Sequence, residues 1–272
     1  MNTKELMDIA LKAAGLDEMP ADCGIIVEGD GIKKVLMGVD MDTAELMLAK
    51  QLGYDCVVSH HPRNTNVDML EVMNAHIRKL EALGVPRNKS QKLLEERKTQ
   101  LSYNQHVSNS RRSESAAKLL GMPYMCIHTP TDIIGEAMVQ SHLDAKFKDK
   151  PETTVQDVVD ALEEICEYKN SARKPKIRVG AKTSYAGKIY VLMSGLTGPG
   201  PKITKEYFEA GVGTLILMHI PESDVKEIKE QNIGNVIVAG HMSSDSLGLN
   251  KVAEEWAKKG VETTMMSGIV EK

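Results

Sequence analysis

The sequence predicts an α/β layered fold with a mostly parallel sheet. Short apolar runs alternate with stretches of helical periodicity along the 272 residues, and this alternation is typical of strands joined by helices. The runs are apolar at nearly every position, as expected for strands that are buried on both faces. Several of them end in Gly or His, which places turns or polar side chains directly behind the predicted strands.

Seven short runs are expected to form strands. The first ends just before Asp40, and the second leads into two adjacent histidines. The expected strands cover residues 33–39, 55–58, 124–127, 189–193, 214–218, 235–239 and 262–266.

Amphipathic stretches between these runs predict the helices. The clearest one follows a capping box formed by Thr153 and Gln156, and its apolar positions recur every three or four residues. The expected helices cover residues 3–14, 42–52, 67–83, 88–99, 111–120, 154–168, 202–210, 223–230 and 245–259.

Two polar, Lys-rich stretches with proline, at 146–154 and 170–176, are typical of loops. They suggest a division into a larger domain, made of 1–135 together with 205–272, and a smaller inserted middle subdomain at 136–204.

The composition excludes several classes of protein. A formal charge of −4 leaves no strong nucleic-acid footprint. No apolar stretch approaches the roughly 18 to 20 residues of a membrane span, and residues 1–15 are typical of an amphipathic helix rather than a signal peptide. The four cysteines form no C-x-x-C pair, so we expect reduced thiols and a cytoplasmic protein.

Histidines gather at one kind of position. Six of the eight follow a predicted strand or extended segment, where ligands collect in open α/β sheets. Imidazole suits Zn, Fe, Co, Ni or Mn, so these side chains would form a metal site in one crevice. They are His60, His61, His106, His128, His219 and His241.

Each piece also has an ordinary interpretation. Adjacent histidines such as His60 and His61 occur in loops by chance, and His106 reads alone as a loop histidine. Asp245 would lie one helical turn after His241 and share its face, or it would be a first-turn acid favoured by the helix dipole. The joint pattern favours metal binding, because independent structural histidines have no reason to select strand ends together.

Three segments resemble the Nif-three-like family, whose members are described as dinuclear metal centre hexameric proteins or GTP cyclohydrolase 1 type 2 homologues. The segments are "ADCGIIVEG", "VLMGVDMDTAELMLAKQLGYDCVVSHHP" and "NVIVAGHMSSDSLGLNKVAEEW". The resemblance covers about residues 1–125 and 205–270. It implies a homo-oligomer, expected to be a hexamer.

The resemblance also implies metal ligands at His60, His61, His241 and Asp245. The family's fifth ligand is an Asp in a His-Thr-x-x-Asp segment. By position His106 takes its place, whereas the literal motif matches "HTPTD" at 128–132. We favour His106 as the ligand, with His128 and Asp132 as pocket residues or substitutes.

His219 stands where the family has an acidic residue. Imidazoles in place of carboxylates reduce the negative charge that balances two divalent ions, so one or two metals per chain are expected. Nitrogen ligation favours Zn, Fe, Co or Ni over Mn.

These features predict a metal-dependent hydrolase that acts on a small anionic or heterocyclic molecule, with nucleotides suggested by the family label. The catalytic candidates are His219 and Asp132. His219 would be a general acid/base, since imidazole titrates near neutral pH, or a sixth metal ligand. The alternative is a non-catalytic metal-binding protein, such as a carrier, sensor or assembly partner. The candidate substrate-binding residues are Arg63, Arg111, Arg112 and His128; Arg111 and Arg112 also read as solvated residues of a helix start.

Overall fold

The computed structural model describes residues 1–62, 68–107 and 111–272, and the chain forms two compact units. Each unit has a sheet of its own. Unit 1 comprises Met1–Met69, Val107–Gly135 and Asp245–Lys272, and unit 2 comprises Leu70–His106 and Glu136–Ser244. These limits differ from the predicted division, because 70–106 and 205–244 cluster with 136–204.

Unit 1 contains a five-stranded sheet in the order β1-β4-β3-β2-β9. All neighbouring strands are parallel except β1, which pairs antiparallel with β4 at one edge. The strands are β1 (Gly24–Val27), β2 (Lys34–Gly38), β3 (Cys56–Ser59), β4 (Tyr124–Cys126) and β9 (Glu262–Met266). The α/β fold with mostly parallel sheet is therefore confirmed.

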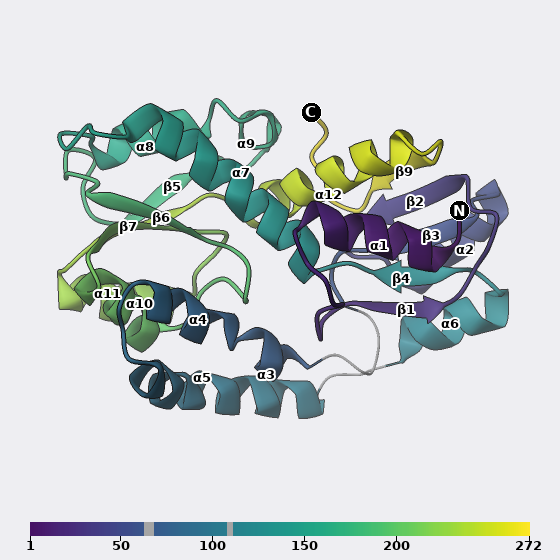
Figure 1. Ribbon diagram of the computed structural model, residues 1–272, viewed down its shortest axis with the longest axis horizontal. Helices are drawn as coiled ribbons and strands as arrows, with labels where there is room; N and C mark the ends of the chain where they lie inside the picture. The colour runs from purple at the N-terminus through teal and green to yellow at the C-terminus, as the bar shows by residue number, and fades with distance from the viewer. Residues whose placement is uncertain (63–67, 108–110) are drawn as a thin grey trace. The chain divides into compact units, whose positions relative to one another are not determined.

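Helices cover both faces of this sheet (Figure 1). On one face, α2 and α6 bury Leu46, Ala49 and Ala117 against Leu36 and Val57 of the strands. On the other face, the buried indole of Trp256 in α12 donates a hydrogen bond to the carbonyl of Leu6 in α1, 3.0 Å away. The helices are α1 (Thr3–Ala13), α2 (Thr43–Leu52), α6 (Arg112–Leu120) and α12 (His241–Ala257), the last beginning in unit 2.

Unit 2 repeats the plan with a four-stranded sheet in the order β5-β8-β7-β6. Again one edge strand, β5, is antiparallel to its neighbour, and the other pairs are parallel. The strands are β5 (Lys176–Val179), β6 (Lys188–Leu192), β7 (Val212–Leu217) and β8 (Asn235–Val238).

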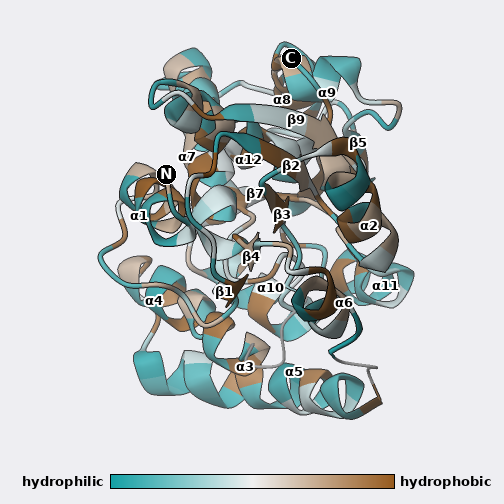
Figure 2. Ribbon diagram, turned by 90° about the vertical axis from the view of Figure 1, so that its right-hand side faces the viewer, coloured by the Kyte–Doolittle hydropathy of each residue, from teal (hydrophilic) through white to brown (hydrophobic). Residues whose placement is uncertain are grey.

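The core of unit 2 joins its sheet to four helices. Side chains of α4, α5, α10 and α11 pack on β6, β7 and β8, with Tyr207 and Leu215 fully buried among them. Figure 2 shows that α5 is otherwise largely hydrophilic. The remaining helices are α3 (Met69–Val72), α4 (Ala75–Ala82), α5 (Arg87–Val107), α7 (Thr129–Phe147, which begins in unit 1), α8 (Val155–Leu162), α9 (Cys166–Asn170), α10 (Pro201–Glu209) and α11 (Glu222–Gln231).

All seven predicted strands are present, but β1 and β5 were not expected. Both are antiparallel edge strands with partly exposed residues, so a search for continuously buried runs missed them. The capping box of α8 lies one residue later than predicted, at Thr154 and Asp157.

Two helices differ from the prediction in ways that matter for the site. The unexpected α7 starts directly behind β4, and α12 begins at His241 rather than at residue 245. Within the described ranges, no helix is both long enough and apolar enough to cross a membrane.

Candidate metal centre

Polar side chains gather at the carboxyl ends of three neighbouring parallel strands of unit 1. Asp40 follows β2, the pair His60 and His61 follows β3, and His128 follows β4. This edge is where open α/β sheets bind ligands. The imidazole rings of His60 and His128 lie 4.6 Å apart, and those of His60 and His61 lie 5.1 Å apart, measured between centroids.

His60 is buried, with an exposed fraction of 1%. Its Nδ1 lies 3.2 Å from the carbonyl oxygen of Ile127 and 2.9 Å from the hydroxyl of Thr131. A carbonyl oxygen can only accept a hydrogen bond, so Nδ1 carries the proton in the neutral ring. The lone pair of the neutral imidazole is therefore on Nε2.

The Nε2 atom of His60 points toward two carboxylates. It lies 3.5 Å from Oδ1 of Asp132 and 3.6 Å from Oδ1 of Asp245. It is buried and has no hydrogen-bond partner among the described residues. A lone pair facing carboxylate oxygens is unfavourable unless a metal ion or a proton lies between them, and such unsatisfied buried groups are rare in folded proteins.

His61 and His128 are held in the same manner. Nδ1 of His61 lies 3.0 Å from Asp40, and Nδ1 of His128 lies 2.6 Å from Asp22. Nε2 of His61 lies 3.7 Å from Oδ2 of Asp245. Carboxylate or carbonyl partners on one ring nitrogen are typical of histidines whose other nitrogen binds metal, because they fix the tautomer and the ring orientation.

Two helices supply the acidic members. Asp132 lies in the first turn of α7, which starts immediately after His128, and Asp245 lies in the second turn of α12. Their exposed fractions are 3% and 1%. Both carboxylates are therefore buried inside unit 1. Burial removes water from them, so a neighbouring positive charge would stabilise their ionised form.

Burial and neighbouring charges shift the pKa values of the two buried histidines in opposite directions. Burial lowers the pKa of His60, which favours the neutral form that a metal requires. Burial would also lower the pKa of His128, but the charge of Asp132 and the hydrogen bond to Asp22 raise it to about 9. Burial of Asp22 is outweighed by the hydrogen bond and charge of His128, so the pKa of Asp22 stays below its ordinary value.

The donor set fits a transition-metal ion. Two donors bound at about 2.1 Å to one tetrahedral ion lie about 3.4 Å apart, close to the distances from Nε2 of His60 to the two carboxylates. Among the described residues of unit 1, two groups could hold a metal ion: His60, His61 and His128, and His60, Asp132 and Asp245.

The predicted ligand His106 is not part of such a group within the described part of the chain. It lies exposed in the last turn of α5, in unit 2. The expectation of an extended segment was wrong, because residues 87–107 contain no Gly or Pro that would end the helix. In the cluster of unit 1, the literal motif "HTPTD" supplies His128 and Asp132.

His219 and His241 lie together in unit 2. His219 follows β7 and His241 opens α12 after β8, and their ring centroids are 4.7 Å apart. His241 precedes Asp245 by one turn of the same helix, as the spacing predicted. The roles predicted for His219 and His241 stay predictions.

The predicted substrate-binding arginines lie at the start of α6 or outside the described residues. Arg63 lies outside the described residues. Arg111 is exposed and lies 3.9 Å from Glu114 at the start of α6. A hydrogen bond from Ser113 and, more weakly, the charge of Arg112 keep the pKa of Asp42 below its ordinary value.

Sequence reasoning missed three residues that orient the histidines: Asp22, Asp40 and Thr131. In the sequence Asp22 lies in the segment "ADCGIIVEG" and Asp40 directly behind a predicted strand, and neither position indicates a contact with a histidine. The motif spacing shows Thr131 one residue before Asp132, but no local pattern shows that its hydroxyl contacts His60.

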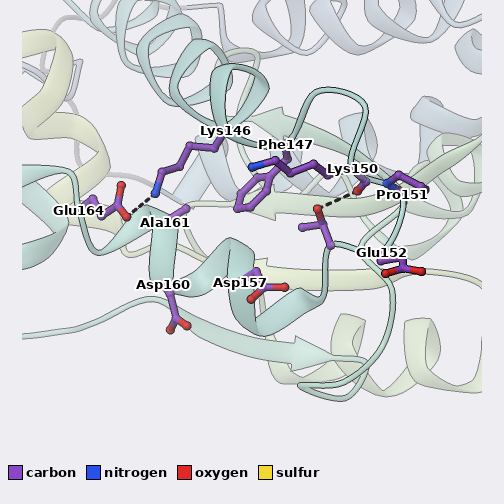
Figure 3. Close-up of a pocket in the computed structure, with 10 residues that line it drawn as sticks. Lys146, Phe147, Lys150, Pro151, Glu152, Asp157, Asp160, Ala161 and Glu164 are labelled. Carbon is purple, nitrogen blue, oxygen red and sulfur yellow. Dashed lines mark hydrogen bonds and ion pairs between the residues drawn. The ribbon is translucent and has the colours of Figure 1, made fainter.

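A hollow of about 660 Å³ lies in unit 2, between the end of α7 and α8 (Figure 3). Three of its charged side chains have partners nearby: Lys146 contacts Glu164, and Asp157 accepts hydrogen bonds from Thr154. This hollow therefore offers no donor set comparable to that of unit 1.

The chain is similar along its whole length to a NIF3 superfamily protein from Sphaerobacter thermophilus. The two are 34% identical, the match covers 98% of each chain, and the TM-score is 0.94. Reduced HcgD from Methanocaldococcus jannaschii is 15% identical over 97% of each chain, with a TM-score of 0.62. TTHA1606 from Thermus thermophilus is 17% identical over 100% of this chain and 98% of the other, with a TM-score of 0.57. The last two show a shared fold. No protein-family model and no curated protein matches the sequence.

Proposed function

The chain belongs to the NIF3 superfamily, and we propose that it is a metal-dependent hydrolase whose centre lies at the carboxyl ends of β2, β3 and β4. The observation that carries this proposal is the buried Nε2 of His60, which has no hydrogen-bond partner among the described residues and faces Asp132 and Asp245.

His60, Asp132 and Asp245 would hold one divalent ion, and His61 and His128 would complete its surroundings or hold a second. Zn, Fe, Co, Ni and Mn are the candidates. When bound, such an ion supplies Lewis acidity, which lowers the pKa of a coordinated water.

The chain's own residues orient the metal-binding side chains and leave one side of the cluster accessible. Asp22 contacts Nδ1 of His128, and Asp40 contacts Nδ1 of His61. Because both rings are already held in place, binding an ion costs less conformational entropy. His61 is the most exposed of the three imidazoles, with 23% of its side chain accessible. A small substrate would therefore approach from its side, and an anionic one would be attracted by the exposed Arg111 and Arg112.

The metal content of the protein tests the proposal directly. Plasma mass spectrometry of the untagged protein should find one or two transition-metal ions per chain. His60→Ala and Asp132→Ala should lose them, whereas His142→Ala, a change in unit 2 outside every candidate group, should keep them.

Turnover is tested with the same variants on GTP and on a panel of phosphate and carboxylate esters. Unchanged metal content in His60→Ala would overturn the proposed centre. Full metal content without hydrolysis of any substrate in the panel would favour the second candidate function.

That second candidate is a non-catalytic metal-binding protein. It is favoured by burial, because His60, Asp132 and Asp245 are all at most 3% exposed and a storage or structural site is closed. Azide binding to the Co²⁺-loaded protein separates the two: a hydrolase keeps an exchangeable position and its visible spectrum changes, whereas a closed site does not respond.

The family resemblance further supports a homohexamer, which light scattering measures. The four cysteines without a C-x-x-C pair support a cytoplasmic location.

A further inference from the structure

A glycine of α12 occupies a special position beside the cluster of unit 1. Gly248 lies three residues after Asp245, on the same side of the helix. A Cβ atom built on Gly248 would lie 2.0 Å from the carbonyl oxygen of Thr131, 2.5 Å from its carbonyl carbon and 2.7 Å from its Cα. The backbone of the first turn of α7 therefore fills the space that any side chain at position 248 would need.

That turn of α7 carries the contacts that define the site. The hydroxyl of Thr131 lies 2.9 Å from Nδ1 of His60, and it also lies within hydrogen-bond distance of the carbonyl of His128, at 2.8 Å. The next residue is Asp132, whose carboxylate lies 3.5 Å from Nε2 of His60. A movement of this backbone would shift groups on both nitrogens of the same imidazole.

We propose that Gly248 is a positioning residue of the metal centre. By lacking a side chain, it lets the first turn of α7 lie directly on α12, and this contact sets where Asp132 stands relative to His60 and Asp245. The proposal rests on the proposed function, because it assumes that these donors share an ion.

The size of the effect follows from the distances. Real Cβ atoms essentially never approach other heavy atoms closer than 3.0 Å, so with an alanine at 248 this position and the Thr131 carbonyl must separate by about 1 Å. The neighbour is backbone and cannot rotate away. Donor sets work only when held within about 0.5 Å of their productive geometry, so metal affinity should fall more than folding alone explains.

Gly29 provides a matched control. A Cβ there would lie 2.3 Å from Cγ of Pro123, which is also closer than 3.0 Å, in the same unit but against a side chain. Gly29 contacts Thr3 through its backbone and none of the cluster residues in the described hydrogen bonds. A purely structural glycine and a positioning glycine should therefore behave differently when metal binding is measured.

The experiment is a Co²⁺ titration of the metal-free protein, followed by the visible absorption of the bound ion. Gly248→Ala should raise the apparent Kd by roughly 10- to 100-fold, as loss of a supporting contact does at other metal sites, and should alter the absorption spectrum. Gly29→Ala, at equal folded fraction by circular dichroism, should keep the wild-type Kd and spectrum.

A second pair of variants covers the case in which Gly248→Ala does not fold. Thr131→Val removes the hydroxyl that contacts His60, and Thr131→Ser keeps it. If Thr131→Val binds Co²⁺ more weakly and Thr131→Ser does not, the contact of α7 with His60 supports metal binding.

The outcomes are separable. Wild-type protein that binds no Co²⁺ overturns the proposed function. Wild-type binding that is unchanged in Gly248→Ala overturns the role of Gly248 alone, as does equal binding by both Thr131 variants where Gly248→Ala is unfolded.

Discussion

At the scale of the residue, the two ring nitrogens of His60 have different surroundings and different roles. Nδ1 meets the carbonyl of Ile127 and the hydroxyl of Thr131, which fix the ring and the tautomer. Nε2 is left facing Asp132 and Asp245 at distances too long for hydrogen bonds and suited to a shared ion. The ring proton is on Nδ1 because the carbonyl oxygen of Ile127 can only accept a hydrogen bond.

Another buried histidine, in unit 2, illustrates the opposite case. His76 is fully buried, and both of its ring nitrogens have partners, the hydroxyl of Tyr207 and the carbonyl of Leu196. Burial, aided by the charge of Lys79, lowers the pKa of His76 to about 4. This histidine is structural, because no lone pair is left facing an acid.

His76 makes folding sensitive to acid. Its pKa is lower in the folded than in the unfolded chain, so between pH 6.5 and 4 the unfolded state binds more protons. The contribution is fully present above pH 6.5 and is lost as the pH falls toward 4, by about 2 kcal/mol between pH 7 and pH 5. Urea unfolding at the two pH values should show a drop smaller by about this amount in His76→Gln than in the wild type. Equal drops in both proteins would contradict the assignment.

At the scale of the element, the site depends on where strands end and helices begin. Three adjacent parallel strands bring Asp40, His60 and His128 to one edge, and α7 follows β4 so closely that His128 and Asp132 lie on successive turns of chain. The helix α7 escaped prediction for a physical reason. Its start is buried on nearly all sides and contains Pro130 and Gly135, so it shows no amphipathic stripe.

The start of α2 is the element-scale feature most open to a stability test. Asp42 caps the helix through Thr43, pairs with Glu45 in a capping box and accepts a hydrogen bond from Ser113 of α6. Asp42→Ala should lower the free energy of unfolding by about 1–2 kcal/mol, and Asp42→Asn, which keeps an acceptor oxygen, by much less. Urea denaturation at neutral pH measures both changes. Equal losses in the two variants would show that charge, rather than the cap, is what matters.

At the scale of the whole molecule, the two units have the same plan, a mostly parallel sheet with one antiparallel edge strand and helices on its faces. The cluster of His60, Asp132 and Asp245 lies entirely in unit 1. Its acidic members come from two helices that also contribute residues to unit 2. Loss of the ion should therefore affect the stability of the folded chain as well as any activity.

Metal removal tests this coupling. An ion that binds only the folded chain, at a free concentration of 100 times its Kd, adds about 3 kcal/mol of stability, which corresponds to a rise in Tm of roughly 5–10 °C for a protein of this size. Scanning calorimetry should show this rise with Zn²⁺, its reversal by a chelator, and its absence in His60→Ala. A Zn²⁺-induced rise in that variant equal to the wild type would place the stabilising ion elsewhere.

The sequence by itself determined the α/β fold, the seven predicted strands and the histidines that follow several of them. Local periodicity and motifs such as "SHHP" and "HTPTD" indicate these features. It favoured His106 over Asp132 as a ligand, because it showed neither that α5 continues through His106 nor that α7 starts behind β4.

Only the tertiary structure brought together groups that are distant in the chain. Asp22 meets His128 across 106 positions, and Thr131 meets His60 across 71. Gly248 matters because a backbone from α7 fills the place of its side chain. Such contacts arise from how folded elements pack, at distances of a few ångströms, and no periodicity along the chain encodes them.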